Sequence, residues 1–130
     1  MNERKETIKV INEAIALQLK KATDYNNQNS RVKQADYYPR GVATILDIIW
    51  AKVLRMQSVV EAMEHDDSYN PNYESIEDSC KDLINYASFI VAYCRGGIDG
   101  QNPNNDFLNR PKKPKKSLYE LKEEMIEDDG

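Results

Sequence analysis

The sequence has few of the residues from which metal and catalytic sites are usually built. It holds one histidine and two cysteines in 130 residues, too few ligands for a structural zinc site. Cys80 and Cys94 fall on one predicted helix, about 21 Å apart at helical rise, so they cannot form a disulfide with each other. We expect both to be small core residues in a reducing compartment. We expect His65 to lie in an acidic loop, and no pattern typical of nucleophilic catalysis is present.

Long apolar runs are missing too. No stretch approaches the roughly 20 apolar residues of a membrane-spanning helix, and the N-terminal MNERKETIKV lacks the apolar core of a secretory signal. We therefore expect a cytoplasmic protein without a membrane partner. The net charge of -4 argues against nucleic-acid binding, except through the basic run at 112–116. A glycine-rich phosphate loop is also absent, because Gly96 and Gly97 follow a helix rather than open one.

Apolar residues at helical spacing predict three main helices, over residues 2–23, 42–64 and 74–94. The first carries one apolar face, formed by Ile8, Ile11, Ile15, Leu19 and Ala22. Ser117 and Glu120 form a capping box ahead of a further short helix. The length fits one domain. We therefore expect an all-α bundle of three main helices and a short C-terminal helix, with the helical domain at 1–97 and a linker and charged tail at 98–130.

The predicted helix 74–94 carries two distinct faces. Its apolar stripe consists of Ile76, Cys80, Leu83, Ala87, Ile90 and Cys94. The opposite face is a row of Glu74, Asp78, Asp82, Asn85 and Phe89, flanked by Tyr86 and Tyr93. Because large aromatics accompany the acids, we expect this helix to be partly buried on both sides, in the middle of a bundle or against a partner. Partly buried acids need a cation to remain ionised.

Two kinds of cation suit these acids. Mg²⁺ takes carboxylate ligands, and Glu74, Glu77, Asp78 and Asp82 are the candidate set. The first three also suit the N-terminus of the helix through its dipole alone. Asp82 lies beyond the first turn, so we expect it to bind either a metal or a basic side chain, Lys52 or Arg55.

Lys52 falls inside the apolar arc of the helix 42–64, with Arg55 at the edge of that arc. A lysine in this position either extends along its stem to water or meets an anion, which would be an acid of the helix 74–94 or a ligand phosphate. The loop 24–41 is long and rich in asparagine, tyrosine and basic residues. It is either a plain surface loop or a functional one.

These segments resemble a family. The series DYNN at 24–27, IIWAKVLRMQ with Lys52 and Arg55, and YESIEDSCKDLINYASFIVAY is similar to the phage and bacterial nucleotide-modification-associated domain, over about residues 20–95. The resemblance implies a role in nucleotide metabolism or modification, without an assigned reaction. A more distant similarity is to the all-α nucleoside triphosphate pyrophosphohydrolases. Those enzymes hold Mg²⁺ between acid pairs on two helices, but here Lys52 and Arg55 stand where the first pair belongs.

Three functions remain open from the sequence. The first is a nucleotide-binding protein that acts on or sequesters a nucleotide or a nucleotide-derived signal. Its candidate site residues are Lys52, Arg55, Asp82, Asn85, Tyr86, Phe89, Arg40 and Tyr38, with Arg31, Lys33 and Tyr37 as further loop candidates. The second is a Mg²⁺-dependent pyrophosphohydrolase that uses the four acids. The third is a non-enzymatic interaction protein. We also expect a homodimer, in which the helices 74–94 contribute to a shared four-helix core.

Overall fold

The computed structural model describes residues 5–65 and 73–112, with the side chains of 73–75 left outside that description. Three long α-helices are present, α1 (Glu6–Tyr25), α2 (Val42–His65) and α3 (Tyr73–Cys94), together with a short 3-10 helix, η2 (Gln34–Tyr37). The described ranges hold no β-strand, only an isolated bridge between Asn105 and Pro111. The predicted all-α bundle of three main helices is therefore confirmed. None of the described helices is long and apolar enough to cross a membrane.

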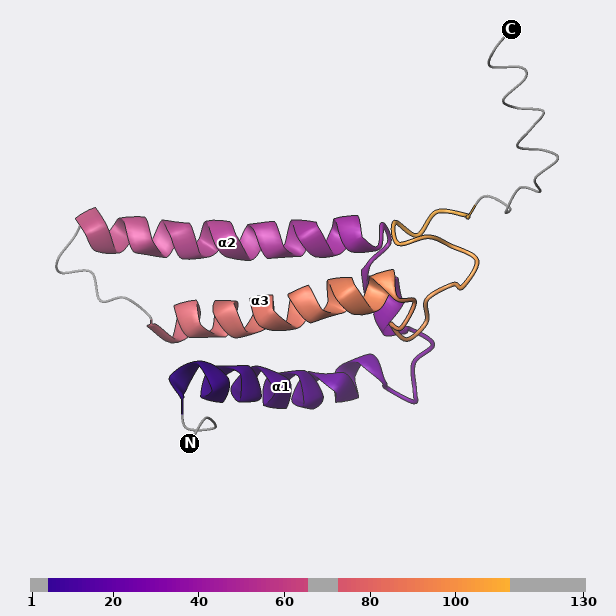
Figure 1. The fold of residues 1–130 in the computed structure, drawn as a ribbon, viewed down its shortest axis with the longest axis horizontal. Helices are drawn as coiled ribbons and strands as arrows, with labels where there is room; N and C mark the ends of the chain where they lie inside the picture. Colours follow the sequence, from indigo (N-terminus) through magenta and orange to yellow (C-terminus); the bar gives the residue numbers. More distant parts are fainter. Residues whose placement is uncertain (1–4, 66–72, 113–130) are drawn as a thin grey trace, which may run out of the picture.

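The three helices lie side by side, with α3 between the other two (Figure 1). α1 and α3 run in the same direction and α2 runs the opposite way. α3 packs along both neighbours, whereas α1 and α2 have no comparable contact with each other. This arrangement accounts for the two faces that the sequence predicts for α3, since each flank of that helix meets a different partner.

The core is concentrated at one end of this layer. It forms where η2, the start of α2, the end of α3 and the segment after α3 meet, and it consists of Ala35, Tyr38, Val42, Ile45, Phe89, Tyr93 and Ile98. α3 ends there in a Schellman motif, in which the N–H of Gly97 donates to the carbonyl of Ala92 at 2.8 Å and Gly96 adopts a φ of 74°. Gly96 and Gly97, which follow the helix in the sequence, thus close its C-terminal end.

The segment after α3 is part of the fold as far as it is described. The predicted linker begins at residue 98, yet Ile98 is buried in the core. The carbonyls of Asp99 and Phe107 accept hydrogen bonds at 2.9 Å from the N–H groups of Ala35 and Val42. Asparagine and aspartate side chains close turns within the segment, which is why it is ordered without a helical pattern. Residues 113–130, including most of the basic run and the predicted short helix, lie outside the described residues.

The apolar face predicted for α1 does not pack against this chain. Ile8, Ile11, Ile15 and Leu19 are 38, 44, 51 and 68% exposed. The side of α1 that meets α3 is instead more polar and centres on Ala14, which is fully buried. A small side chain at this position lets the two backbones approach closely. An apolar stripe on a helix usually faces a core, but the described residues leave this one largely exposed.

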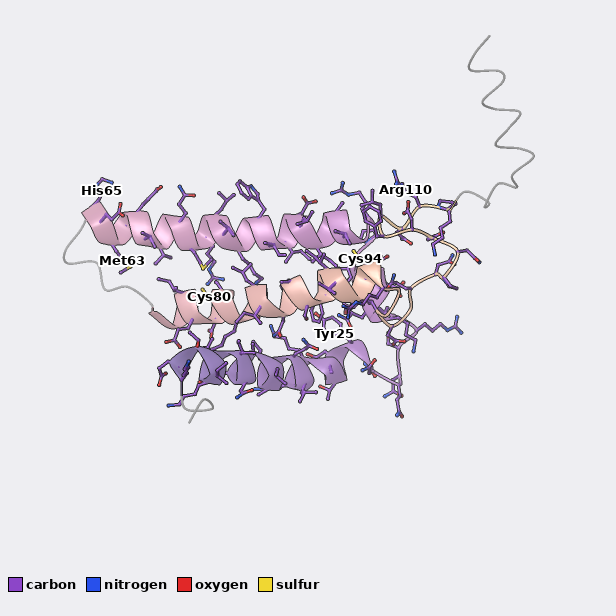
Figure 2. The ribbon with its side chains drawn as sticks, in the orientation of Figure 1. Tyr25, Met63, His65, Cys80, Cys94 and Arg110 are labelled. Carbon is purple, nitrogen blue, oxygen red and sulfur yellow. The ribbon has the colours of Figure 1, made fainter. Side chains whose placement is uncertain are left out.

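The two cysteines differ in exposure, since Cys80 is half-buried and Cys94 is exposed. Cys80 is half-buried between α2 and α3 (Figure 2). Its Sγ lies 3.5 Å from the Sδ of Met56. Cys94, at the end of α3, is exposed, which corrects the expectation that both are core residues. Both are free thiols.

The turn before α2 gives a first prediction. Gly41 has a φ of 58°, and a Cβ there would overlap the carbonyl oxygen of Phe107, which accepts the first N–H of α2. Gly96 shares the positive φ, but its Cβ would meet open space. Gly96→Ala should therefore cost about 1–2 kcal/mol of unfolding free energy from backbone strain alone. Gly41→Ala should cost about 1–3 kcal/mol more because it also forces an overlap.

Urea unfolding of both variants and the unchanged protein measures the difference. Equal losses for Gly41→Ala and Gly96→Ala would contradict the close approach of Phe107 to Gly41.

Candidate functional site

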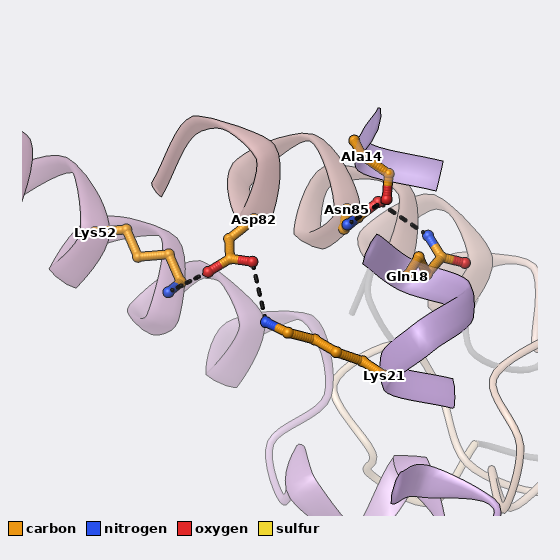
Figure 3. Close-up of polar contacts among 6 residues, drawn as sticks. All are labelled: Ala14, Gln18, Lys21, Lys52, Asp82 and Asn85. Atoms are coloured by element: carbon orange, nitrogen blue, oxygen red, sulfur yellow. Dashed lines mark hydrogen bonds and ion pairs between the residues drawn. The ribbon is translucent and has the colours of Figure 1, made fainter. Parts of the chain in front are cut away.

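Asp82 of α3 lies at the point where all three helices exchange polar contacts (Figure 3). Its Oδ2 accepts a hydrogen bond from Lys52 Nζ of α2 at 3.1 Å, and its Oδ1 accepts one from Lys21 Nζ of α1 at 3.2 Å. The carboxylate and Lys52 are partly buried, with 18 and 23% of their side chains exposed, whereas Lys21 is 47% exposed. The contact between Lys52 and an acid of α3 is therefore present, as one of the sequence-based alternatives had it.

The charges at this point do not cancel. Burial alone would raise the pKa of Asp82, but hydrogen bonds and charges from Lys52 and Lys21 outweigh burial and hold it below its ordinary value. Asp82 is thus ionised at neutral pH. One carboxylate faces two ammonium groups, so the cluster has an excess of one positive charge.

Aromatic side chains surround the ion pairs. Lys52 Nζ lies 5.7 Å from the centroid of the Tyr86 ring, within the range of a cation–π interaction. Phe89 packs edge-on against Tyr86, with ring centroids 5.6 Å apart. Burial, with smaller contributions from Tyr25 and Asp82, raises the pKa of Tyr86 to about 12, so its hydroxyl is a neutral donor at neutral pH.

Asn85 fixes α1 against this side of α3. It is 7% exposed, and its Nδ2 donates to the carbonyl of Ala14 at 3.0 Å, while its Oδ1 accepts from Gln18 Nε2 at 3.1 Å (Figure 3). Both halves of the amide are therefore used in joining the two helices. Asn85 positions the site rather than offering a free group to a ligand.

A small cavity opens between α1 and α3 beside these residues. Its volume is about 60 Å³, and its lining consists of Gln18, Lys21, Ala22, Tyr25, Gln34, Asp82, Asn85, Tyr86 and Phe89. Four of the predicted site residues, Asp82, Asn85, Tyr86 and Phe89, therefore meet at one cavity, and Lys52 lies against two of them. Besides Asp82 and Asn85, the lining offers a lysine that can bind an anion, two glutamine amides that can hydrogen-bond to a ligand, and three aromatic rings that can pack against a ligand ring.

The other predicted ligand-binding residues lie elsewhere or serve other roles. Tyr38 is 1% exposed, packs edge-on against Tyr93 and belongs to the core. Arg40 is exposed and pairs with Asp47. Arg55 is exposed on α2.

The four-acid magnesium set is only partly described. Glu77 and Asp78 are exposed, and the Oε2 of Glu77 lies 3.9 Å from the Nζ of Lys81. Asp82 is occupied by its two lysines, and the side chain of Glu74 is outside the described part. Among the described side chains, no three from His, Cys, Asp and Glu gather in a way that could hold a metal ion. The complete set remains a prediction.

Sequence reasoning missed the contribution of α1. Lys21, Gln18 and Tyr25 line the cavity. The only face predicted for α1 was its apolar stripe, which lies on another side of the helix. A signal was available, since Ala14, Gln18, Lys21 and Tyr25 recur at steps of four, three and four. That spacing places one small and three polar or amphipathic residues on a single face.

Comparison with known proteins found no match. No protein family, curated protein or solved structure matches this chain. The resemblances drawn from the sequence therefore remain predictions, and the candidate site stands on its own geometry.

The depressed pKa of Asp82 gives a second prediction. Because this pKa lies below the ordinary 3.8, the ion pairs stabilise the fold above about pH 4 and lose that contribution as pH falls through the folded-state pKa. Asp82→Asn should lower the unfolding free energy at pH 7 by about 1–3 kcal/mol, because two lysines lose a charged acceptor. The difference between the variant and the unchanged protein should shrink as the solution is acidified below pH 4.

Urea unfolding at a series of pH values measures both effects. Asp24→Asn, an exposed position at the end of α1, is the matched control and should follow the unchanged protein. A difference that persisted undiminished in acid would contradict the assignment of these ion pairs to Asp82.

Proposed function

We propose that the protein binds a small anionic ligand that carries a ring, and that a nucleotide or nucleotide-derived molecule is the class that fits best. The observation that carries this proposal is the convergence of Lys21 and Lys52, from two different helices, on one carboxylate beside an aromatic cavity. Two cations held 3.1–3.2 Å from the same group are already close enough to share a phosphate.

The lysines supply the affinity for phosphate. Asp82 orders both ammonium groups before a ligand arrives, and it neutralises only one of the two charges. A phosphate at the rim would accept charge-assisted hydrogen bonds from both lysines. The two lysine side chains therefore lose less conformational entropy when a ligand binds, because the ion pairs already order them in the folded protein.

The cavity supplies the affinity for a ring. Its volume of about 60 Å³ would hold roughly four to six waters, at about 10–15 Å³ for each. Only one part of a nucleotide therefore enters, and the remainder lies across the rim toward Lys21 and Lys52. Tyr25, Tyr86 and Phe89 offer aromatic surface to a base, and Gln34 offers an amide to its edge.

Binding without conversion suits this arrangement, because the two lysines attract an anion and the described lining of the cavity holds no serine, threonine or cysteine. The sequence resemblance supports a nucleotide as the ligand, since it implies a role in nucleotide metabolism in phages or bacteria. Action as a homo-oligomer in the cytoplasm belongs to the same proposal.

Ligand screening with lysine variants tests this function and is the third prediction. Thermal shift against nucleoside mono-, di- and triphosphates and cyclic dinucleotides, each with and without Mg²⁺, should find a stabilising ligand that needs no metal. Calorimetry should then show binding weakened by about 10- to 100-fold in Lys52→Gln and in Lys21→Gln, as the loss of one charged hydrogen bond predicts. Lys20→Gln, the exposed neighbour on α1, should bind like the unchanged protein.

Two results would contradict the proposal. One is the absence of stabilisation by any member of the panel. The other is a ligand whose affinity survives both Lys21→Gln and Lys52→Gln. Chromatography of the recovered ligand separates binding from turnover, and conversion that requires Mg²⁺ would instead favour the pyrophosphohydrolase.

A further inference from the structure

A set of large apolar side chains lies uncovered along the helical layer. We define the apolar face by eight residues: Ile8, Ile11, Ile15 and Leu19 of α1, Leu46, Trp50 and Val60 of α2, and Val91 of α3. Each is between 38 and 68% exposed. The first four form an apolar stripe of the kind that usually packs against a partner, yet the described residues leave it largely exposed.

The stripes of α1 and α2 emerge on the same side of the layer. In each helix the stripe follows directly after a fully buried contact residue, since Ile15 follows Ala14 and Leu46 follows Ile45. One step along an α-helix turns by about 100°, so each stripe is displaced about a quarter turn in the same sense. α1 and α2 run in opposite directions on opposite flanks of α3 (Figure 1). A rotation by 180° about the axis perpendicular to the layer therefore carries the position and direction of α1 onto those of α2. This rotation does not exchange the two sides of the layer, so the two stripes lie on the same side.

α3 completes this face and separates it from the candidate site. Val91 follows Asp82 by nine residues, which is about half a turn around the helix at 100° per residue. It therefore projects from the side of α3 opposite to Asp82. The ion pairs and the apolar face thus lie on opposite sides of the layer and share no residue.

The uncovered area is large for a monomer. From their exposed fractions, the eight side chains present on the order of 800 Å², about the area that each partner contributes to a standard protein interface. The largest apolar patch on a typical monomer is roughly 300–600 Å². Domains are usually built from two packed layers around a core, whereas here three helices form one layer with a core at one end.

A second copy of this chain is the occupant that matches the face best. The stripe on α1 is free of charge. The residues of α1 three or four positions from its members are uncharged as well: Thr7, Asn12, Ala14, Ala16, Gln18, Ala22 and Thr23. Two copies would therefore meet there without opposing like charges. The segment 113–130 is the other occupant that the chain itself offers, but its aliphatic side chains are only Leu118, Leu121, Met125 and Ile126, half as many as the face contains.

We infer that two copies of the protein associate through the apolar face, stacking their helical layers into a two-layer bundle with a shared core and their candidate sites directed outward. The interface is isologous, as expected for a twofold homodimer. It differs from the dimer predicted from the sequence, because α1 and α2 supply most of the contact surface and α3 supplies a smaller part.

The single tryptophan makes this association directly measurable and gives the fourth prediction. Trp50 is the only tryptophan in the chain and is 63% exposed in one copy. Light scattering of the full chain should give twice the 15.0 kDa of a single copy. The Trp50 fluorescence should be protected from acrylamide in that species, and quenching should increase several-fold upon dilution to the monomer.

Substitutions on the face complete the test. Leu46→Glu and Ile15→Glu each place a charge at a half-exposed position, so they should reduce the mass to one copy while circular dichroism remains helical. Ala51→Glu is the matched control, because this residue is exposed on another side of α2, and it should remain dimeric. If the face variants fail to fold, the dilution series on the unchanged protein decides the question.

Three outcomes would overturn the inference. A monomer at all concentrations would leave the face to a different partner. A dimer in which Trp50 is quenched as readily as free tryptophan, or whose mass survives both face variants, would place the interface elsewhere. A mass above two copies would exclude the two-layer arrangement.

Discussion

The carboxylate of Asp82 connects all three helices of a layer whose outer helices scarcely meet. Lys21 reaches it from α1 and Lys52 from α2, so the two outer helices are coupled through one side chain of the central helix. Burial makes this contact costly to break, because removing the acid leaves two lysines near each other without their shared counter-ion. The same feature gives the site its chemistry, since one acid cannot neutralise two cations.

The distribution of packing explains why polar contacts matter so much here. Buried apolar residues gather where η2 and the segment after α3 close one end of the layer, and α1 contributes only Ala14 to the fully buried set. The attachment of α1 therefore depends on polar contacts along its length, made by Asn85 and Gln18 and by the ion pair of Glu13 with Lys81 at 3.0 Å. Such contacts fix orientation well but contribute less stability than a packed apolar interface.

Periodicity in the sequence was enough to predict the three main helices and two packed sides for α3, with a central place in the bundle as one of two explanations for them. The mixture of acids and aromatics on the helix 74–94 indicated a helix with two packed sides. Lys52 inside an apolar arc left two alternatives, a route to water or an anionic partner, and the structure has the second. The role of α1 was not predictable in the same way. A stripe of isoleucine and leucine has the same pattern whether it meets its own chain or another molecule, and only the positions of the neighbouring helices separate the two cases. The packing of residues 98–112 was missed for a different reason, because turns closed by asparagine and aspartate leave no periodic signal.

The two sides of the layer are coupled through α1. Lys21, Gln18 and Tyr25 of this helix form one wall of the cavity, while Ile8, Ile11, Ile15 and Leu19 lie on its uncovered stripe. A second layer packed on that stripe would hold α1 by apolar contact where the single chain holds it mainly by polar contact. The position of Lys21 relative to Asp82 would then be fixed more firmly, and the cavity with it. Association would therefore favour ligand binding without adding any residue to the site, and by linkage a ligand that orders α1 would favour association to the same extent.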